Sequence, residues 1–124
     1  MKKFSIEKST DLINYVVDVT IMDEGVVIVV GGGISHIGTL ILAQPRKSLT
    51  GDGTISATSS VINLLGHLDE VPFRREAELL AIKINQPVVV TGGIHLDNIN
   101  KDDIKKIHLD CREIFQKIAE NLKL

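Results

Sequence analysis

The spacing of apolar residues changes once along this chain, and that change constrains the fold more than any other feature. In the first half apolar residues alternate with polar ones, as in a strand with one face on the core. The clearest run is Ile13, Tyr15, Val17, Val19 and Ile21. After residue 70 they recur every three or four positions, as in amphipathic helices. The pattern predicts an α+β domain in which helices pack on a mixed sheet.

The first half of the chain has the signals of an antiparallel meander. The strands that the pattern predicts cover residues 4–7, 12–21, 26–30, 37–43 and 54–65. The turn residues 23–25 separate the second and third of these, which predicts a hairpin. The third strand is purely aliphatic, so we expect it to be buried on both faces. The glycines at 31–33 are interpreted as a hairpin loop, in which Ser35 and His36 could reach a partner, and residues 44–53 as an exposed loop.

The second half predicts a β-α-β-α unit. One helix begins after His67 and ends at Asn85 and Pro87. Its apolar stripe is Phe73, Ala77, Leu80, Ala81 and Ile84. A short buried strand follows at 88–90, and a second helix at about 101–122, with Asn100 as its cap. The whole chain is expected to form an antiparallel meander followed by this unit.

Composition limits the kind of protein and its partners. A chain of 124 residues with 44% hydrophobic side chains fits one domain, covering residues 1–124. The net charge is −2, from 14 Lys and Arg against 16 Asp and Glu, so we expect no general binding to nucleic acid or anionic membranes. The single cysteine, Cys111, is interpreted as a small core hydrophobe. We expect a cytoplasmic protein with no secretory signal and no membrane span.

One junction occurs twice in the second half. Gly66-His67-Leu68-Asp69 follows the strand at 54–65, and Gly93-Ile94-His95-Leu96-Asp97 follows the strand at 88–90. A helical crossover between these strands predicts that they pair in parallel. Parallel strands end at the same edge of a sheet, where α/β folds commonly place ligands. The two junctions are therefore expected to meet.

The meeting of the two junctions predicts a site for a phosphate-sized anion. Helix starts there would present unpaired N–H groups, glycines would admit a ligand close to the backbone, and histidines can donate to phosphate. The candidate binding residues are Gly66, His67, Asp69, Arg74, Gly92, Gly93, His95 and Asp97. Three other interpretations stay open: Asp69 and Asp97 as ordinary helix caps, a zinc site from His67, His95 and one aspartate, and an acid–base enzyme using the two histidines.

The chain resembles a family of small accessory proteins. The residues that carry this resemblance are Gly66-His67-x-Asp69, Arg74, Ala77, Pro87-Val88-Val89-Val90 and Gly93-Ile94-His95-x-Asp97-Asn98. They resemble the small D-type subunit that accompanies gallate-type aromatic acid decarboxylases. That family is described as a prenylated-flavin chaperone related in fold to proteasome assembly chaperones.

The resemblance implies a non-enzymatic homodimer that binds prenylated flavin mononucleotide, or ordinary FMN, for the decarboxylase large subunit. The flavin phosphate would suit the doubled junction, and Ile94 and Leu96 would form an apolar wall for the ring. The alternative is a homodimeric assembly or scaffold protein without a small-molecule ligand. In that case the apolar stripe of the last helix, which includes Ile114 and Ile118, would contact its copy.

Overall fold

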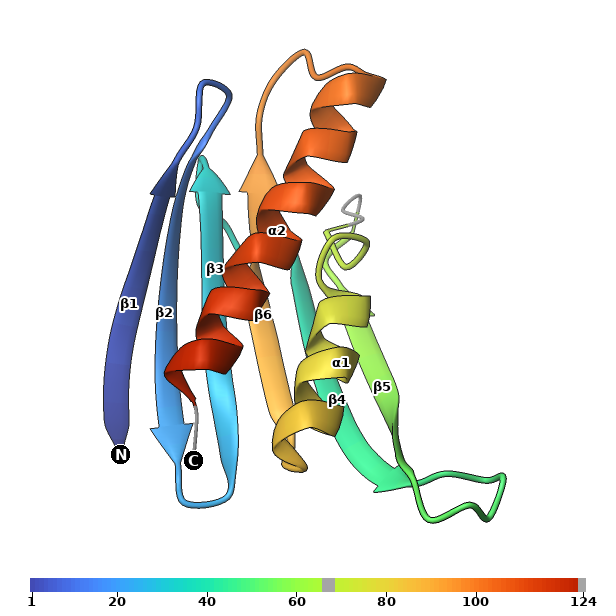
Figure 1. The fold of residues 1–124 in the computed structure, drawn as a ribbon. Helices are drawn as coiled ribbons and strands as arrows, with labels where there is room; N and C mark the ends of the chain where they lie inside the picture. The colour runs from blue at the N-terminus through green and yellow to red at the C-terminus, as the bar shows by residue number, and fades with distance from the viewer. Residues whose placement is uncertain (66–68, 123–124) are drawn as a thin grey trace.

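A computed structural model describes residues 1–65 and 69–122. It contains one six-stranded sheet and two helices (Figure 1). The elements in chain order are β1 (Lys2–Ser9), β2 (Asn14–Met22), β3 (Gly25–Gly33), β4 (Thr39–Lys47), β5 (Ile55–Asn63), α1 (Arg74–Ile84), β6 (Val88–His95) and α2 (Lys101–Asn121). The predicted α+β class, with helices packed on a mixed sheet, is confirmed.

The predicted hairpin is present, but the meander is interrupted. β2 pairs antiparallel with β3, as expected. The strand order is β1-β2-β3-β6-β4-β5, so β6 lies between β3 and β4 and runs parallel to β3. The glycines 31–33 therefore lead into a connection that passes over β6, and the prediction of a hairpin loop is wrong. The reason is that β6 is aliphatic and finds ladder partners on both sides in the centre of the sheet.

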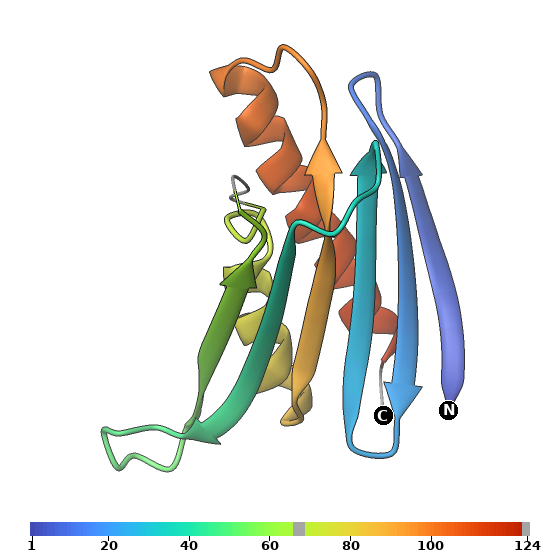
Figure 2. The ribbon, with the colours of Figure 1, turned by 180° about the vertical axis from the view of Figure 1, so that it is seen from behind.

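The expected pairing of β5 with β6 is also wrong. β4 lies between them and is antiparallel to both. Because β4 is antiparallel to both of these strands, β5 and β6 run in the same direction although they are not neighbours. Their carboxyl ends consequently lie at one edge of the sheet, together with that of β3 (Figure 2).

Local signals set the ends of the helices as predicted. α1 is followed by Asn85 in the left-handed conformation, with φ of 53°. α2 begins with a capping box, in which Asn100 and Asp103 each accept a hydrogen bond from the other's backbone N–H. β4 is longer than expected and includes residues 44–47, which were assigned to a loop. Beyond Ala43 it pairs with β5 alone, where the missing N–H of Pro45 is tolerated.

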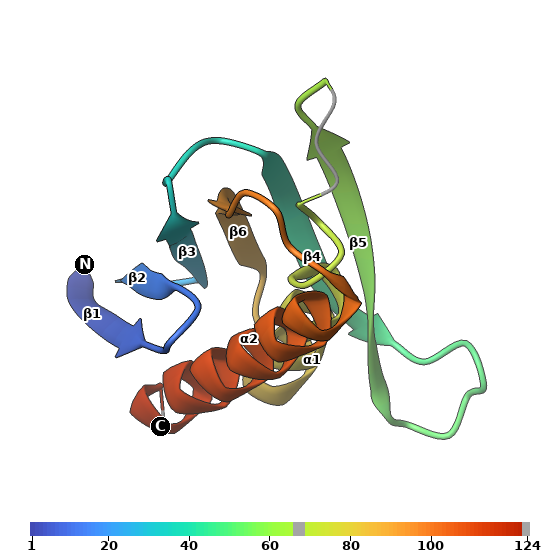
Figure 3. The same cartoon turned by 90° about the horizontal axis from the view of Figure 1, so that it is seen from above.

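Both helices cover the same face of the sheet, as the view from above shows (Figure 3). The side chains between this face and the helices form the core. Val26, Ile28 and Val30 of β3 are buried there, and so are Ile114 and Ile118 of α2. The Tyr15 hydroxyl donates to Asp110 of α2 at 2.8 Å and ties the helix to β2. In the described part of the chain, no helix has the length and apolar character needed to cross a membrane.

The opposite face, here called the open face, is uncovered (Figure 2). Val29 of β3 points to it and is 45% exposed, so the expectation that this strand is buried on both faces is wrong. The strand is aliphatic on both sides, but the helices pack on only one of them. Cys111 lies in the core as predicted, and burial raises the pKa of its thiol to about 12.

Candidate functional site

The connection between β3 and β4 builds the first part of the site. Residues 34–38 cross β6 on the open face (Figure 2). The Ile34 N–H donates to the carbonyl of His95 at 3.2 Å, and the Gly38 N–H donates to the carbonyl of Gly92 at 2.9 Å. These bonds hold the His36 ring against Gly93, where an added Cβ would lie 2.5 Å from Nε2 of the imidazole. Only glycine at position 93 leaves room for this ring.

The two nitrogens of His36 both face hydrogen-bond acceptors. Nδ1 lies 3.1 Å from the carbonyl oxygen of Ile34, and Nε2 lies 3.0 Å from Oδ2 of Asp69. A neutral imidazole has one N–H, so both bonds form only in the doubly protonated ring. The carbonyl of Ile34, and then the Asp69 carboxylate, raise the pKa of His36 above its ordinary value, against an opposing effect of burial. His36 is therefore favoured as a cation.

Asp69 joins three segments that are far apart in the sequence. It comes from the β5–α1 connection, binds His36 of the β3–β4 connection, and accepts the N–H of Ile94 in β6 through Oδ1 at 3.3 Å. A Cβ at position 38 would overlap its carboxylate, so Gly38 makes room for it. The side chain is only 12% exposed. Asp69 thus fixes the position of the His36 ring at the sheet edge.

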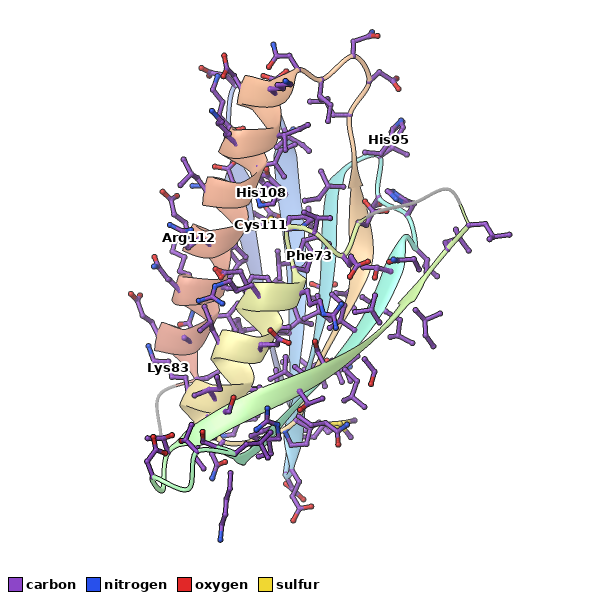
Figure 4. The ribbon with its side chains drawn as sticks, turned by 90° about the vertical axis from the view of Figure 1, so that its right-hand side faces the viewer. Phe73, Lys83, His95, His108, Cys111 and Arg112 are labelled. Atoms are coloured by element: carbon purple, nitrogen blue, oxygen red, sulfur yellow. The ribbon has the colours of Figure 1, made fainter. Side chains whose placement is uncertain are left out.

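The second junction lies beside this pair. Nε2 of His95 is 3.0 Å from Oδ1 of Asp97. The His36 and His95 rings have centroids 6.1 Å apart and are nearly perpendicular, at 87°. Figure 4 shows His95 at the end of β6, away from His108, Cys111 and Arg112 on the helix side. Two imidazoles and two carboxylates consequently gather at the carboxyl edge of β6.

A hollow of about 460 Å³ adjoins His36 on the open face. Its floor includes Gly31, which pairs with Gly93 in the β3–β6 ladder. Its walls are largely aliphatic, from Val16, Val29 and Ile37, with polar contributions from Asp18, Ser35, His36 and Thr91. The volume falls within the range of small-molecule sites, which is roughly 300–1,000 Å³. The hollow therefore combines aliphatic walls with one imidazole and one carboxylate.

The structure brings most of the predicted residues together. Asp69, Gly92, Gly93, His95 and Asp97 lie around the edge just described, whereas Gly66 and His67 fall outside the described residues. Arg74 lies elsewhere, because its guanidinium donates to Ser59 Oγ at 2.9 Å and pairs with Glu70 at 3.4 Å. In the sequence His36 was noted as a loop residue that could reach a partner, but it was not among the candidate binding residues. Its glycine-rich surroundings were the available signal.

The paired helix starts do not supply the positive end of the site. The N–H groups of Phe73 and Arg74 donate to the carbonyl of Glu70, and the Asn100 side chain caps α2. Asp69 and Asp97 therefore do not cap helices, and that interpretation is wrong. Beside the hollow, the side chain able to carry a positive charge is His36.

Two further expectations are changed or left untested. Ile94 and Leu96 pack against the core, so they are not the apolar wall of the hollow. Within residues 1–65 and 69–122, no group of three or more His, Cys, Asp or Glu side chains is placed to hold a metal ion. The proposed zinc site included His67, which lies outside this range.

The fold is similar to that of a chain in a solved chaperone complex. A chain in the crystal structure of a chaperone complex for yeast 20S proteasome assembly is similar over 98% of both chains, with a TM-score of 0.61 and 17% identity. At this identity the likeness concerns the fold alone. Among curated proteins, none matches the chain.

The family follows from a second comparison. The model of the LpdD-like prenylated flavin chaperone domain matches residues 9–123, and the chain belongs to this family. This match confirms the resemblance to prenylated-flavin chaperones, and the solved structure confirms the expected likeness in fold to a proteasome assembly chaperone. It also confirms the expected non-enzymatic role, because the family is one of chaperones.

Proposed function

We propose that this protein holds prenylated FMN, or FMN, for an aromatic acid decarboxylase and carries out no chemistry on it. The observation that carries the proposal is the aliphatic hollow with the His36 imidazole at its edge, in a member of a prenylated flavin chaperone family. A prenylated flavin combines an apolar ring system with an anionic phosphate. The hollow offers aliphatic walls for the ring system and the His36 imidazole for the phosphate.

Different residues of the hollow would contact the ring and the phosphate of the ligand. Val16, Val29 and Ile37 would contact the apolar ring and exclude water from it. The protonated His36 ring would attract the phosphate only weakly, since both of its N–H groups already donate to Ile34 and Asp69 and the Asp69 carboxylate balances its charge. Among the described residues that line the hollow, His36 is the one side chain able to carry a positive charge, and Asp18 is the one acidic side chain. A single imidazolium binds phosphate less firmly than a bidentate arginine pair, which suits a protein that must release its cargo.

Thermal unfolding in the presence of flavins tests this function. A ligand at one hundred times its dissociation constant stabilises the folded state by about 2.7 kcal/mol, which raises the melting temperature by several degrees. We expect FMN or prenylated FMN to produce this shift, and His36→Gln to weaken binding at least tenfold. His108→Gln, on α2, is the matched control and should bind as the unaltered protein does. If neither flavin shifts the transition, the proposal fails.

The partner, the oligomeric state and the compartment belong to the same proposal. We expect a homodimer that works in the cytoplasm with the decarboxylase large subunit. Mixing the cofactor-loaded chain with cofactor-free decarboxylase tests the partner: flavin absorbance should move to the large subunit on gel filtration. Absorbance that stays with the small protein would contradict a delivery role.

The alternative is an assembly or scaffold protein without a small-molecule ligand. The aliphatic side chains on the open face favour it, because such a surface suits protein contact. Substituting Ile114 or Ile118 with a charge would not test it, since both are buried in the core and the fold itself would be lost. In this alternative His36→Gln leaves partner binding intact and no flavin stabilises the protein.

A further inference from the structure

A groove lies between the two helices, on the covered side of the sheet. Both helices run in the same direction along it (Figure 1). Its lining includes Glu76, Leu79 and Lys83 of α1, and Arg112, Phe115 and Gln116 of α2. Within each helix these residues are three or four positions apart, so each set lies on one face of its helix. The groove, here called the helix groove, is therefore bounded by two helix stripes that run side by side.

The dimensions of the helix groove suit a segment of protein better than a cofactor. Its volume is about 220 Å³, which is smaller than the hollow beside His36 and below the roughly 300–1,000 Å³ of small-molecule sites. From Glu76 to Lys83 the helix rises about 10 Å, which is two turns. Phe115 is buried there, and Leu79 is 45% exposed. The groove can therefore accept the apolar side chains of about two turns of another helix.

The two cations of the helix groove are left without an ion pair. The positions three and four residues away on either side of Lys83 and of Arg112 contain no Asp or Glu, so neither helix neutralises its own cation. Within residues 1–65 and 69–122, neither side chain has a hydrogen bond or an ion pair. Lys8, by contrast, pairs with Glu113 at 2.7 Å. Figure 4 shows both unpaired residues on the helix side of the molecule.

The charge of the helix groove differs in sign from that of the whole chain. Among the described residues that line it, Glu76 is the one carboxylate and stands against the two cations Lys83 and Arg112. The chain as a whole has a net charge of −2. A locally positive groove attracts an acidic partner and disfavours a basic one.

We propose that the helix groove is the docking site for an acidic amphipathic helix of a partner protein. Apolar side chains of that helix, at positions i, i+3, i+4 and i+7, lie against Leu79 and Phe115. Carboxylates on its flanks pair with Lys83 and Arg112. No described residue lines both this groove and the hollow beside His36, so the proposal does not depend on flavin binding.

Two helical peptides test the charge of the occupant. Both carry leucine at positions i, i+3, i+4 and i+7, and they differ only at the flanking positions, which are glutamate in one and lysine in the other. Fluorescence anisotropy with the full chain should show that the acidic peptide binds at least tenfold more tightly. An acidic peptide that does not bind, or equal binding of the two peptides, would overturn the proposal.

Charge reversal in the helix groove tests the location. The double variant Lys83→Glu/Arg112→Glu should bind the acidic peptide at least tenfold more weakly, and both side chains are exposed, so the fold should be retained. The matched control is Arg75→Glu/Lys106→Glu, which has the same net charge and changes exposed residues of the same two helices outside the groove. Circular dichroism verifies the fold of each variant. An equal loss of binding in the control would overturn the site.

A third variant and a mass measurement distinguish the remaining occupants. Leu79→Ser removes an exposed apolar side chain without changing charge, and it should also weaken binding of the acidic peptide. Unchanged binding would show that the cations alone attract the peptide and would overturn the docking of an apolar helix face. Light scattering on the unaltered chain and on Lys83→Glu/Arg112→Glu should give the same molar mass. A lower mass for the variant would show that a second copy occupies the groove, and would overturn the proposal of a different partner.

Discussion

The two junctions share the tripeptide His-Leu-Asp but use its aspartate differently. Asp69 of the first junction is 12% exposed, binds His36 and accepts the N–H of Ile94. Asp97 of the second is 76% exposed and contacts only the nearby His95 among the described residues. Both carboxylates lie 3.0 Å from an imidazole nitrogen. Equal distances therefore accompany very different surroundings.

Burial and the number of partners decide what each pair contributes. An exposed ion pair contributes little, because water competes with both partners and screens their charges. A partly buried carboxylate that accepts two hydrogen bonds is harder to replace, since its loss leaves donors without a partner. The His36–Asp69 pair is therefore expected to hold the residues of the site in place, and the His95–Asp97 pair is expected to contribute little.

The largest effect is expected from adding a methyl group at position 38. Gly38→Ala places a Cβ on the Asp69 carboxylate, so Asp69 must turn away from His36 and Ile94. We expect the free energy of unfolding to fall by about 2–3 kcal/mol, measured by urea denaturation. In an Asp69→Gly background the collision is absent, so the same change should cost clearly less. Additive effects in this double-mutant cycle would contradict the role of Gly38.

Removing the charge of Asp69 has the next largest effect. Asp69→Asn keeps the size of the side chain but weakens its bond to the His36 cation. We expect a loss of about 1–2 kcal/mol in unfolding free energy, and a lower His36 pKa in an NMR titration. A His36 pKa that does not change on this substitution would show that Asp69 does not hold the ring.

The stability contributed by the His36–Asp69 pair is expected to depend on pH. The folded pKa of His36 is raised, so its contribution is complete below the ordinary value of 6.5 and is lost as the pH rises through the folded pKa. The stability difference between the unaltered protein and Asp69→Asn should therefore be larger at about pH 6 than at about pH 9. Urea denaturation at both values measures it. A difference that grows with pH would have the wrong sign.

The smallest effect is expected at the second junction. Asp97→Asn removes one exposed charge and should change the unfolding free energy by less than about 0.5 kcal/mol. The His36 titration should be unaltered. A loss as large as that of Asp69→Asn would show that the two junctions are equivalent after all, and would end the distinction drawn between them.

Much of the local structure was predictable, but the arrangement of strands was not. Asn85 and Asn100 mark helix ends through backbone conformation and capping, which depend on a few neighbouring residues. The place of β6 between β3 and β4 depends on pairing between residues about 60 positions apart, and periodicity contains no information on it. The error at Gly31–Gly33 follows from this.

The candidate site, too, was predictable where it depends on short motifs and unpredictable where it depends on the arrangement of strands. Asp69, Gly93 and His95 were selected because the two junctions were expected to share an edge, and parallel direction alone was enough for that. His36 was not selected, since it reaches Gly93 only when the β3–β4 connection crosses an inserted strand. Its charge depends on Ile34 and Asp69 together, and the second of these is 33 residues away.

By itself the sequence determined the α+β class, the helix ends, the buried thiol and the family, because these follow from short-range patterns and motifs. Tertiary structure alone decided the strand order, the uncovered face and the union of His36 with Asp69. Those features depend on contacts between distant segments, whose free energy is set by packing and desolvation in the folded chain.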